Sequence, residues 1–158
     1  MAETGSCCYP VLINKGFSRM KIFALFLSVT LSTTLIAGEK PYAPEEMPGT
    51  TNVSAEEVIE MILANPELIV IDSRKKTEYI KGHIEGAVNI LNTELGLEEL
   101  EFIVPDRTTA LLFYCNGVRC LRSSDSLIKA AGWGYTNLFW FRGGWKEWTE
   151  KRLPVVTD

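Results

Sequence analysis

The chain has 158 residues, which fits one domain of ordinary size, and 46% of them are hydrophobic. This balance excludes a coiled coil and a collagen. The formal net charge is −4 and no basic stripe is present, so nucleic acid is not an expected partner.

The first predicted element is a secretory signal peptide over residues 20–37. Lys21 supplies a positive start, residues 22–36 an apolar core, and Ala37 a small residue at a cleavage point. The alternatives are a retained membrane anchor and a buried helix, but the run is short for a span and serines and threonines dilute it. We therefore expect an exported protein, most consistent with a bacterial periplasm, without a stable membrane anchor after cleavage. Residues 1–19 are a leader whose status stays open, because Met20 is an alternative start.

Residues 38–50 contain three prolines and are expected to form an extended lead-in to a domain over residues 51–155. A helix should start at Ser54, which forms a capping box with Glu57. Its apolar positions are Val58, Ile59, Ile62 and Leu63.

The rest of the domain alternates short apolar runs with helical patterns. Strands are predicted over residues 68–71, 87–90, 110–114 and 137–141, and helices over 75–80, 95–102, 123–131 and 145–150. Unbroken apolar strands alternating with helices predict a three-layer α/β fold, with a central, mostly parallel sheet and helices on both faces. Ligands bind such sheets beyond the carboxyl ends of the strands, where Asp72, Cys115 and Arg142 should lie.

The segment over residues 109–124 carries the clearest chemical signal. An apolar strand ends in Cys115, a loop containing Gly117 and two arginines follows, and a helix begins at Ser123. The amides of such a loop and the helix end create positive potential, which favours the reactive thiolate. The pattern predicts thiol chemistry on an anionic ligand.

Six motifs in order resemble the single-domain rhodanese family over roughly residues 53–148. They are Asp72-Ser-Arg74, Gly82-His83 to Ile90, Tyr114-Cys115, Arg122-Ser123, Gly134-Tyr135 and Gly143-Gly144-Trp-Lys-Glu-Trp148. The resemblance implies a sulfurtransferase in which Cys115 takes a sulfane sulfur from a thiosulfate-like donor. Cys115 would hold this sulfur as a persulfide and pass it to a thiol or to cyanide.

The resemblance also implies that the loop after Cys115 binds the persulfide and the anionic donor. This loop comprises Asn116, Gly117, Val118, Arg119, Cys120, Leu121 and Arg122. In the family the arginine usually stands five positions after the cysteine, whereas Arg122 stands seven after Cys115. The loop is therefore longer by about two residues and contains a second cysteine, which leaves the natural donor open.

Several side chains have two interpretations. Cys120 is either a resolving thiol for Cys115 or a loop filler. Arg119 and Arg122 suit anion binding, although Arg122 could instead form a structural ion pair at the helix start. Asp72 and Arg74 are expected to organise the sheet edge, with Glu78 as a candidate partner of Arg74.

No cofactor is expected, and no metal, because one histidine and two cysteines give poor ligand spacing for zinc. The resemblance places that histidine, His83, in a structural turn.

Two other functions compete with sulfur transfer. A cysteine-dependent phosphatase or arsenate reductase is disfavoured because six residues, rather than five, separate Cys115 from Arg122, and Tyr114 replaces a histidine. A non-catalytic sulfur carrier or redox partner would cycle Cys115 and Cys120 through a disulfide. The expected partners are a small sulfur donor and a thiol or cyanide acceptor. A protein partner is compatible with sulfur transfer and with the redox cycle of Cys115 and Cys120.

Overall fold

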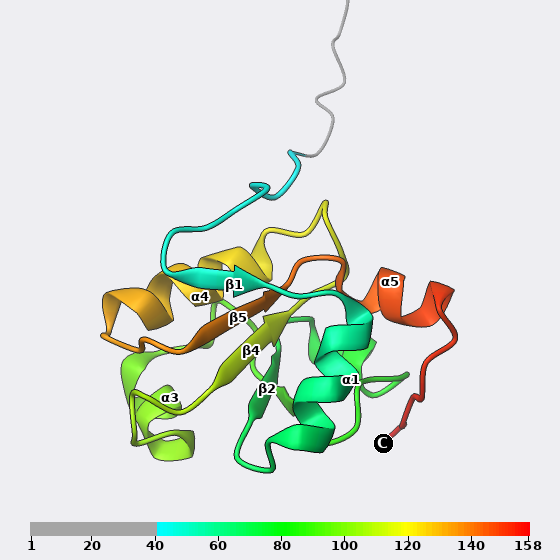
Figure 1. Cartoon of the computed structure of the whole chain (residues 1–158). Helices are drawn as coiled ribbons and strands as arrows, with labels where there is room; N and C mark the ends of the chain where they lie inside the picture. The colour runs from blue at the N-terminus through cyan, green and yellow to red at the C-terminus, as the bar shows by residue number, and fades with distance from the viewer. Residues whose placement is uncertain (1–40) are drawn as a thin grey trace, which may run out of the picture. The chain divides into compact units, whose positions relative to one another are not determined.

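The computed structural model describes residues 41–158, so the predicted leader and signal peptide lie outside the described residues. The described chain folds into alternating strands and helices (Figure 1). The strands are β1 (Thr50–Asn52), β2 (Ile69–Asp72), β3 (Val88–Asn89), β4 (Leu111–Tyr114) and β5 (Leu138–Phe141). The helices are α1 (Ala55–Ala64), α2 (Lys76–Tyr79), α3 (Leu97–Ile103), α4 (Arg122–Gly132) and α5 (Gly144–Glu150).

The strands form a five-stranded sheet in the order β1-β5-β4-β2-β3, and every neighbouring pair is parallel. Asp72 pairs with Tyr114, and Tyr114 with Phe141, so β2, β4 and β5 end at the same level. The predicted parallel α/β sheet is confirmed. Strand β4 lies in the middle of the sheet and is completely buried, which explains its unbroken apolar sequence.

Helices cover both faces of the sheet and enclose two hydrophobic clusters. Leu111 and Phe113 face one cluster, which includes Leu100 of α3 and Leu127 of α4. Leu112 and Tyr114 face the other, which includes Val58 of α1, Tyr79 of α2 and Trp148 of α5. Because neighbouring residues of a strand point to opposite faces, β2, β4 and β5 each contribute to both clusters.

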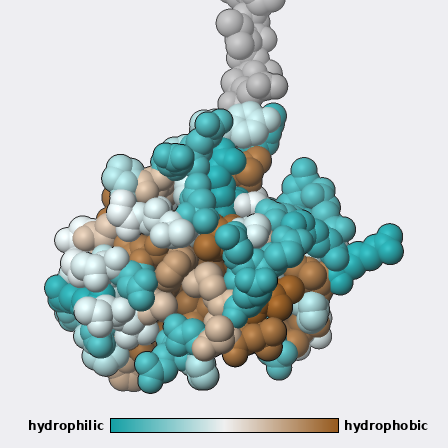
Figure 2. All heavy atoms as spheres, viewed as in Figure 1, coloured by the Kyte–Doolittle hydropathy of each residue, from teal (hydrophilic) through white to brown (hydrophobic). Residues whose placement is uncertain are grey.

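The predicted capping box of α1 is present: the Ser54 side chain accepts from the Glu57 amide, and Glu57 accepts from the Ser54 amide. The predicted apolar face is wrong at Leu63, which is 79% exposed although Val58 is fully buried. Ile59 and Ile62 pack against the core with Val58, and Leu63 lies one position beyond this stripe. Figure 2 shows hydrophobic side chains gathered where α1 lies.

The predicted helices and strands agree with the structure to within about two residues at each end. Strand β1 was not predicted from the sequence, because its residues are polar and lack an alternating pattern. Thr50 to Asn52 pair with β5 through the backbone, with Asn52 opposite Trp140. Backbone hydrogen bonding to an existing strand edge therefore determines this element.

Residues 41–49 lead from the loop that follows β4 to the start of β1. Ala43 and Met47 are buried in the core, and the Ala43 amide donates to the Val118 carbonyl at 2.8 Å. Arg142, after β5, donates to the carbonyls of Ala43 and Pro44. This segment is therefore attached to the loop that follows β4.

Among residues 41–158, no helix combines the length and apolar character that a membrane crossing requires.

Candidate active site

Cys115 directly follows β4 and begins the loop that leads into α4. Cys115 is 1% exposed, and its carbonyl accepts a hydrogen bond from the Trp145 amide at 2.8 Å. The Asn116 carbonyl likewise accepts from the Lys146 amide at 3.1 Å. The first turn of α5 therefore fixes the start of the loop at the carboxyl edge of the sheet.

Two glycines make this close approach feasible. Gly144, at the start of α5, has a φ of +55°, and a Cβ on it would collide with the Cys115 carbonyl. Gly117 has a φ of +139°, and its carbonyl accepts from the Cys120 amide at 2.8 Å. Side chains rarely adopt these backbone angles, so both positions favour glycine. The Gly117 turn directs Cys120 back toward Cys115.

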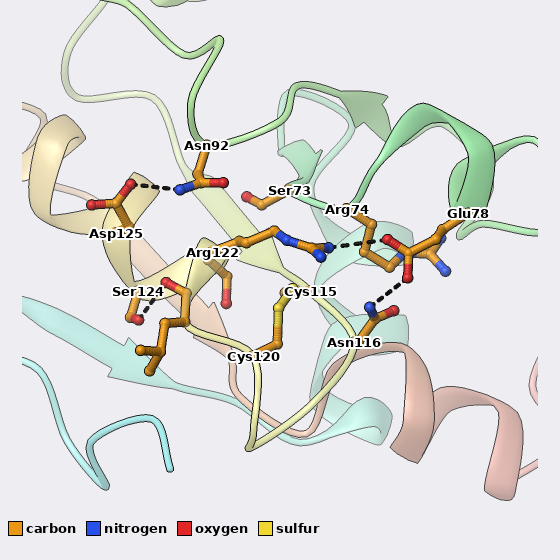
Figure 3. Close-up of a disulfide and its surroundings, with 12 residues drawn as sticks. Ser73, Arg74, Glu78, Asn92, Cys115, Asn116, Cys120, Arg122, Ser124 and Asp125 are labelled. Carbon is orange, nitrogen blue, oxygen red and sulfur yellow. Dashed lines mark hydrogen bonds and ion pairs between the residues drawn. A yellow bond between two sulfur atoms is a disulfide. The ribbon is translucent and has the colours of Figure 1, made fainter. Parts of the chain in front are cut away.

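The sulfurs of Cys115 and Cys120 are joined in a disulfide, with their Cα atoms 6.2 Å apart (Figure 3). The two cysteines differ in access. Cys120 is partly exposed and lines a pocket, whereas Cys115 is buried and is absent from the lining. The structure thus brings the two predicted cysteines together, with Cys120 on the solvent side.

The pocket beside the disulfide has a volume of about 810 Å³. It is lined by Tyr42, Asn92, Asn116, Gly117, Val118, Arg119, Cys120, Leu121, Arg122, Asp125 and Lys146. The whole predicted loop after Cys115 therefore faces this space. Asp125 accepts a hydrogen bond from Asn92 at 2.8 Å. Three of the lining side chains are basic, namely Arg119, Arg122 and Lys146, and they create a positive potential that favours anionic ligands.

Backbone amides add to that potential. Among residues 41–158, the amides of Asn116, Gly117, Val118 and Arg119 donate to no protein acceptor. The amide of Cys120, by contrast, donates to the Gly117 carbonyl. Among the described residues, four of the five amides over residues 116–120 therefore have no protein partner, in a loop that ends at the N-terminus of α4 and whose residues line the pocket.

Arg122 forms an ion pair with Glu78, which differs from the expected pairing of Glu78 with Arg74. Arg122 Nη1 lies 3.0 Å from Glu78 Oε2, and Asn116 Nδ2 donates to Glu78 Oε1 at 2.7 Å (Figure 3). Glu78 also accepts from the Lys75 amide at the start of α2. Burial alone would raise the pKa of Glu78, but the hydrogen bonds from Asn116 and Lys75 and the Arg122 guanidinium lower it overall. Glu78 thus holds both ends of the loop.

Arg74 pairs instead with Asp72 beneath the edge of the sheet. Both side chains are buried, Arg74 Nη2 lies 2.6 Å from Asp72 Oδ2, and the guanidinium also donates to the Gly82 carbonyl. The Tyr114 hydroxyl donates to Asp72 at 2.6 Å. Burial, the Asp72 charge and this hydrogen bond raise the pKa of Tyr114, so the hydroxyl stays protonated. Asp72 and Arg74 therefore support the edge without facing the pocket.

Arg119 is exposed and contacts Tyr42 from the N-terminal segment. Its guanidinium donates to the Tyr42 hydroxyl at 2.6 Å and lies 4.4 Å from the centre of the ring. Four further residues line the pocket although the sequence did not indicate them: Tyr42, Asn92, Asp125 and Lys146. No signal could have identified Tyr42, because it lies in a proline-rich segment without periodicity, 77 positions from Arg119.

His83 lies in a turn, buried and stacked on Tyr79 with ring centroids 3.7 Å apart. Its Nδ1 lies 3.1 Å from the Tyr79 carbonyl, and its backbone pairs with Val156. Within the described part of the chain, no cluster of three or more histidine, cysteine and acidic side chains could hold a metal ion.

Residues 54–151 match the rhodanese-like domain family. The Escherichia coli K12 protein YibN is 24% identical over 96 residues, covering 60% of this chain and 65% of YibN. The tRNA uridine(34) hydroxylase of Photorhabdus laumondii is 30% identical over 112 residues, covering 65% of this chain and 30% of the hydroxylase. The chain thus matches just under two thirds of the length of YibN and less of the hydroxylase.

Solved structures agree with this relationship. The BH2092 protein of Bacillus halodurans superposes with a TM-score of 0.60 at 20% identity, covering 68% of this chain and 77% of that one. A thiosulfate sulfurtransferase from Pseudomonas aeruginosa gives a TM-score of 0.56 at 26% identity, covering 68% of this chain and 20% of that one. The family match spans more than half of the sequence and the architecture agrees with it, so the chain belongs to the rhodanese-like domain family.

Proposed function

We propose that this protein is an exported sulfurtransferase that carries sulfane sulfur as a persulfide on Cys115. The observation that carries the proposal is the position of Cys115, buried at the end of the central strand and at the start of a loop whose free amides border a basic pocket. Membership of the rhodanese-like family and the similarity to a thiosulfate sulfurtransferase support it.

In the charging step, the thiolate of reduced Cys115 attacks the outer sulfur of an anionic donor such as thiosulfate. A bond forms between Cys115 and that sulfur, and sulfite leaves with the electron pair of the broken bond. The loop amides and the N-terminus of α4 would stabilise both the thiolate and the persulfide anion. A thiol or cyanide then removes the outer sulfur.

Export to the periplasm remains part of this proposal. It rests on the signal-like residues 20–37, and a disulfide in the loop is compatible with an oxidising compartment. Cell fractionation followed by determination of the N-terminal residue tests it: we expect a periplasmic chain that starts at Gly38, and a cytoplasmic chain starting at Met1 or Met20 would contradict export.

The test of sulfur transfer uses the full chain with Cys7 and Cys8 replaced by serine, so that only the loop cysteines remain. The reduced protein is incubated with thiosulfate and cyanide, and thiocyanate is measured. We expect turnover in Cys120→Ser, the matched control in which Cys115 is the only loop thiol, and none in Cys115→Ser. Unchanged turnover in Cys115→Ser would contradict the proposal.

The disulfide favours a second candidate, a redox partner that cycles the two cysteines without carrying sulfur. This protein would exchange electrons with a dithiol but would gain no sulfur mass from thiosulfate or polysulfide.

A further inference from the structure

We propose that Cys120 discharges the Cys115 persulfide and that the resulting disulfide is reopened by an external thiol at Cys120. This inference rests on the proposed sulfur transfer and identifies its acceptor class as thiols. It gives the second cysteine of the loop a defined step in the cycle and predicts hydrosulfide as a product.

The first support is the reach of Cys120 to the sulfur of Cys115. The two sulfurs are bonded, and the Cα separation of 6.2 Å lies within the usual range for disulfides. The turn at Gly117, closed by the Cys120 amide, holds the second cysteine over the first. The loop can therefore place a Cys120 thiolate in contact with Cys115 Sγ, which is the atom it must attack to release the outer sulfur.

The second support is the unequal access to the two sulfurs. Cys120 lines the pocket, whereas Cys115 is 1% exposed. An incoming thiolate therefore meets Cys120 first. Attack there makes Cys115 the leaving group, and the nearby loop amides and α4 terminus favour its departure as a thiolate. This is the form that attacks the next donor.

The steps balance in atoms and electrons. The Cys120 thiolate attacks Cys115 Sγ, a disulfide bond forms, the bond to the outer sulfur breaks, and that sulfur leaves as hydrosulfide. The two cysteines thereby supply the two electrons that reduce the sulfane sulfur. One external thiolate then attacks Cys120 and forms a mixed disulfide with it, and Cys115 leaves as a thiolate. A second external thiolate attacks the external sulfur of this mixed disulfide, which releases the Cys120 thiolate and the disulfide of the two external thiols. Per cycle, thiosulfate and two thiols give sulfite, hydrosulfide, one proton and one disulfide.

The pocket also indicates the charge of the entering thiol. Arg119 is exposed, and among residues 41–158 it pairs with the neutral Tyr42 hydroxyl and with no carboxylate. Lys146 lines the same pocket, and its one ion pair within the described part of the chain is an exposed 3.7 Å contact with Glu150. Both charges are therefore available to a ligand, which favours a negatively charged thiol such as glutathione over a positively charged one such as cysteamine.

A single-turnover experiment tests the discharge step. Full-length protein with Cys7 and Cys8 replaced by serine is reduced, freed of reductant and mixed with thiosulfate or polysulfide. In the protein with both loop cysteines, we expect one hydrosulfide per chain and a mass lower by two hydrogen atoms. Cys120→Ser should stop at a gain of one sulfur atom without hydrosulfide, and Cys115→Ser should show neither change.

The outcomes separate this inference from the function on which it rests. If the protein with both cysteines keeps the extra sulfur and forms no disulfide, sulfur transfer stands and the role of Cys120 falls. If Cys120→Ser gains no sulfur from either donor, the proposed function falls and this inference falls with it.

The position of thiol attack is tested on the oxidised protein. It is mixed briefly with glutathione, quenched with N-ethylmaleimide and digested with trypsin, which separates the two cysteines by cleaving after Arg119. We expect glutathione on the peptide of residues 120–122 and the maleimide on that of residues 108–119. The reverse distribution would overturn the assignment.

Discussion

Two arginine–carboxylate pairs lie at the carboxyl edge of the same sheet, yet they differ in what they can do. Arg74 and Asp72 are 1% and 0% exposed, and their ion pair is 2.6 Å long. Arg122 and Glu78 are 28% and 35% exposed, and their ion pair is 3.0 Å long. The first pair lies beneath the edge, and only the second has a member that lines the pocket.

The comparison teaches that burial, more than residue type, determines whether an arginine can serve a ligand. The guanidinium of Arg74 is occupied by Asp72, the Gly82 carbonyl and the ring of Trp145 at 4.3 Å. Breaking a buried pair leaves an uncompensated charge, whereas partly exposed pairs contribute at most about 1 kcal/mol. Arg122 can therefore exchange Glu78 for an anion at little cost, and Arg74 cannot exchange Asp72.

The largest expected effect comes from removing Arg74. Arg74→Met should lower the free energy of unfolding by about 3–5 kcal/mol, because it leaves the Asp72 carboxylate buried without its partner. Urea unfolding measures this loss, with Arg122→Met as the matched control at about 1 kcal/mol or less. Equal losses in the two variants would remove the distinction between the pairs.

The next effect concerns the affinity for the proposed donor, thiosulfate. Arg122→Gln should raise the KM for thiosulfate about tenfold, since a charge-assisted hydrogen bond contributes about 1.5–3 kcal/mol and solvent screens part of it. Steady-state thiocyanate formation gives this value. An unchanged KM, together with a large loss of stability, would assign Arg122 to structure alone.

A smaller effect should appear in the pH dependence of stability. Because the folded protein lowers the pKa of Glu78, the unfolded chain binds more protons near this pKa, and the Glu78 contribution is lost as the pH falls through the folded value. The stability difference between the original protein and Glu78→Gln should therefore shrink on acidification below about pH 4 and stay constant at neutral pH. Urea unfolding at several pH values measures it, and a difference that grows on acidification would contradict the sign.

The smallest effect is expected at Arg119, which is exposed and paired with Tyr42. Arg119→Gln should change the free energy of unfolding by about 0.5 kcal/mol or less and slow disulfide reduction by glutathione about threefold. Two controls should show no such slowing. Reduction of Arg119→Gln by cysteamine involves no anionic thiol, and reduction of Tyr42→Phe by glutathione keeps the Arg119 charge. Equal slowing for both thiols would show that charge is not the cause.

The sequence was sufficient to predict the parallel sheet and the placement of Cys115 at a strand end, because apolar runs and turn residues are local signals. It did not predict β1, whose polar residues Thr50 to Asn52 are ordered by pairing with β5. The partner of Glu78 was also missed. Its pairing with Arg122 spans 44 positions and depends on how the longer loop returns to the sheet, which no local pattern encodes.

Strand β1 has a consequence for where this domain can be cut. It is the outermost strand beside β5, and it lies before residue 54, where the family match begins. A chain trimmed to the matched residues would leave the backbone groups of β5 open along a sheet edge, and such edges recruit strands from other molecules. It would also lose the bridge between His83 and Val156 at the other end. We therefore expect the trimmed chain to self-associate, whereas one that keeps residues 41–158 retains its own edge protection.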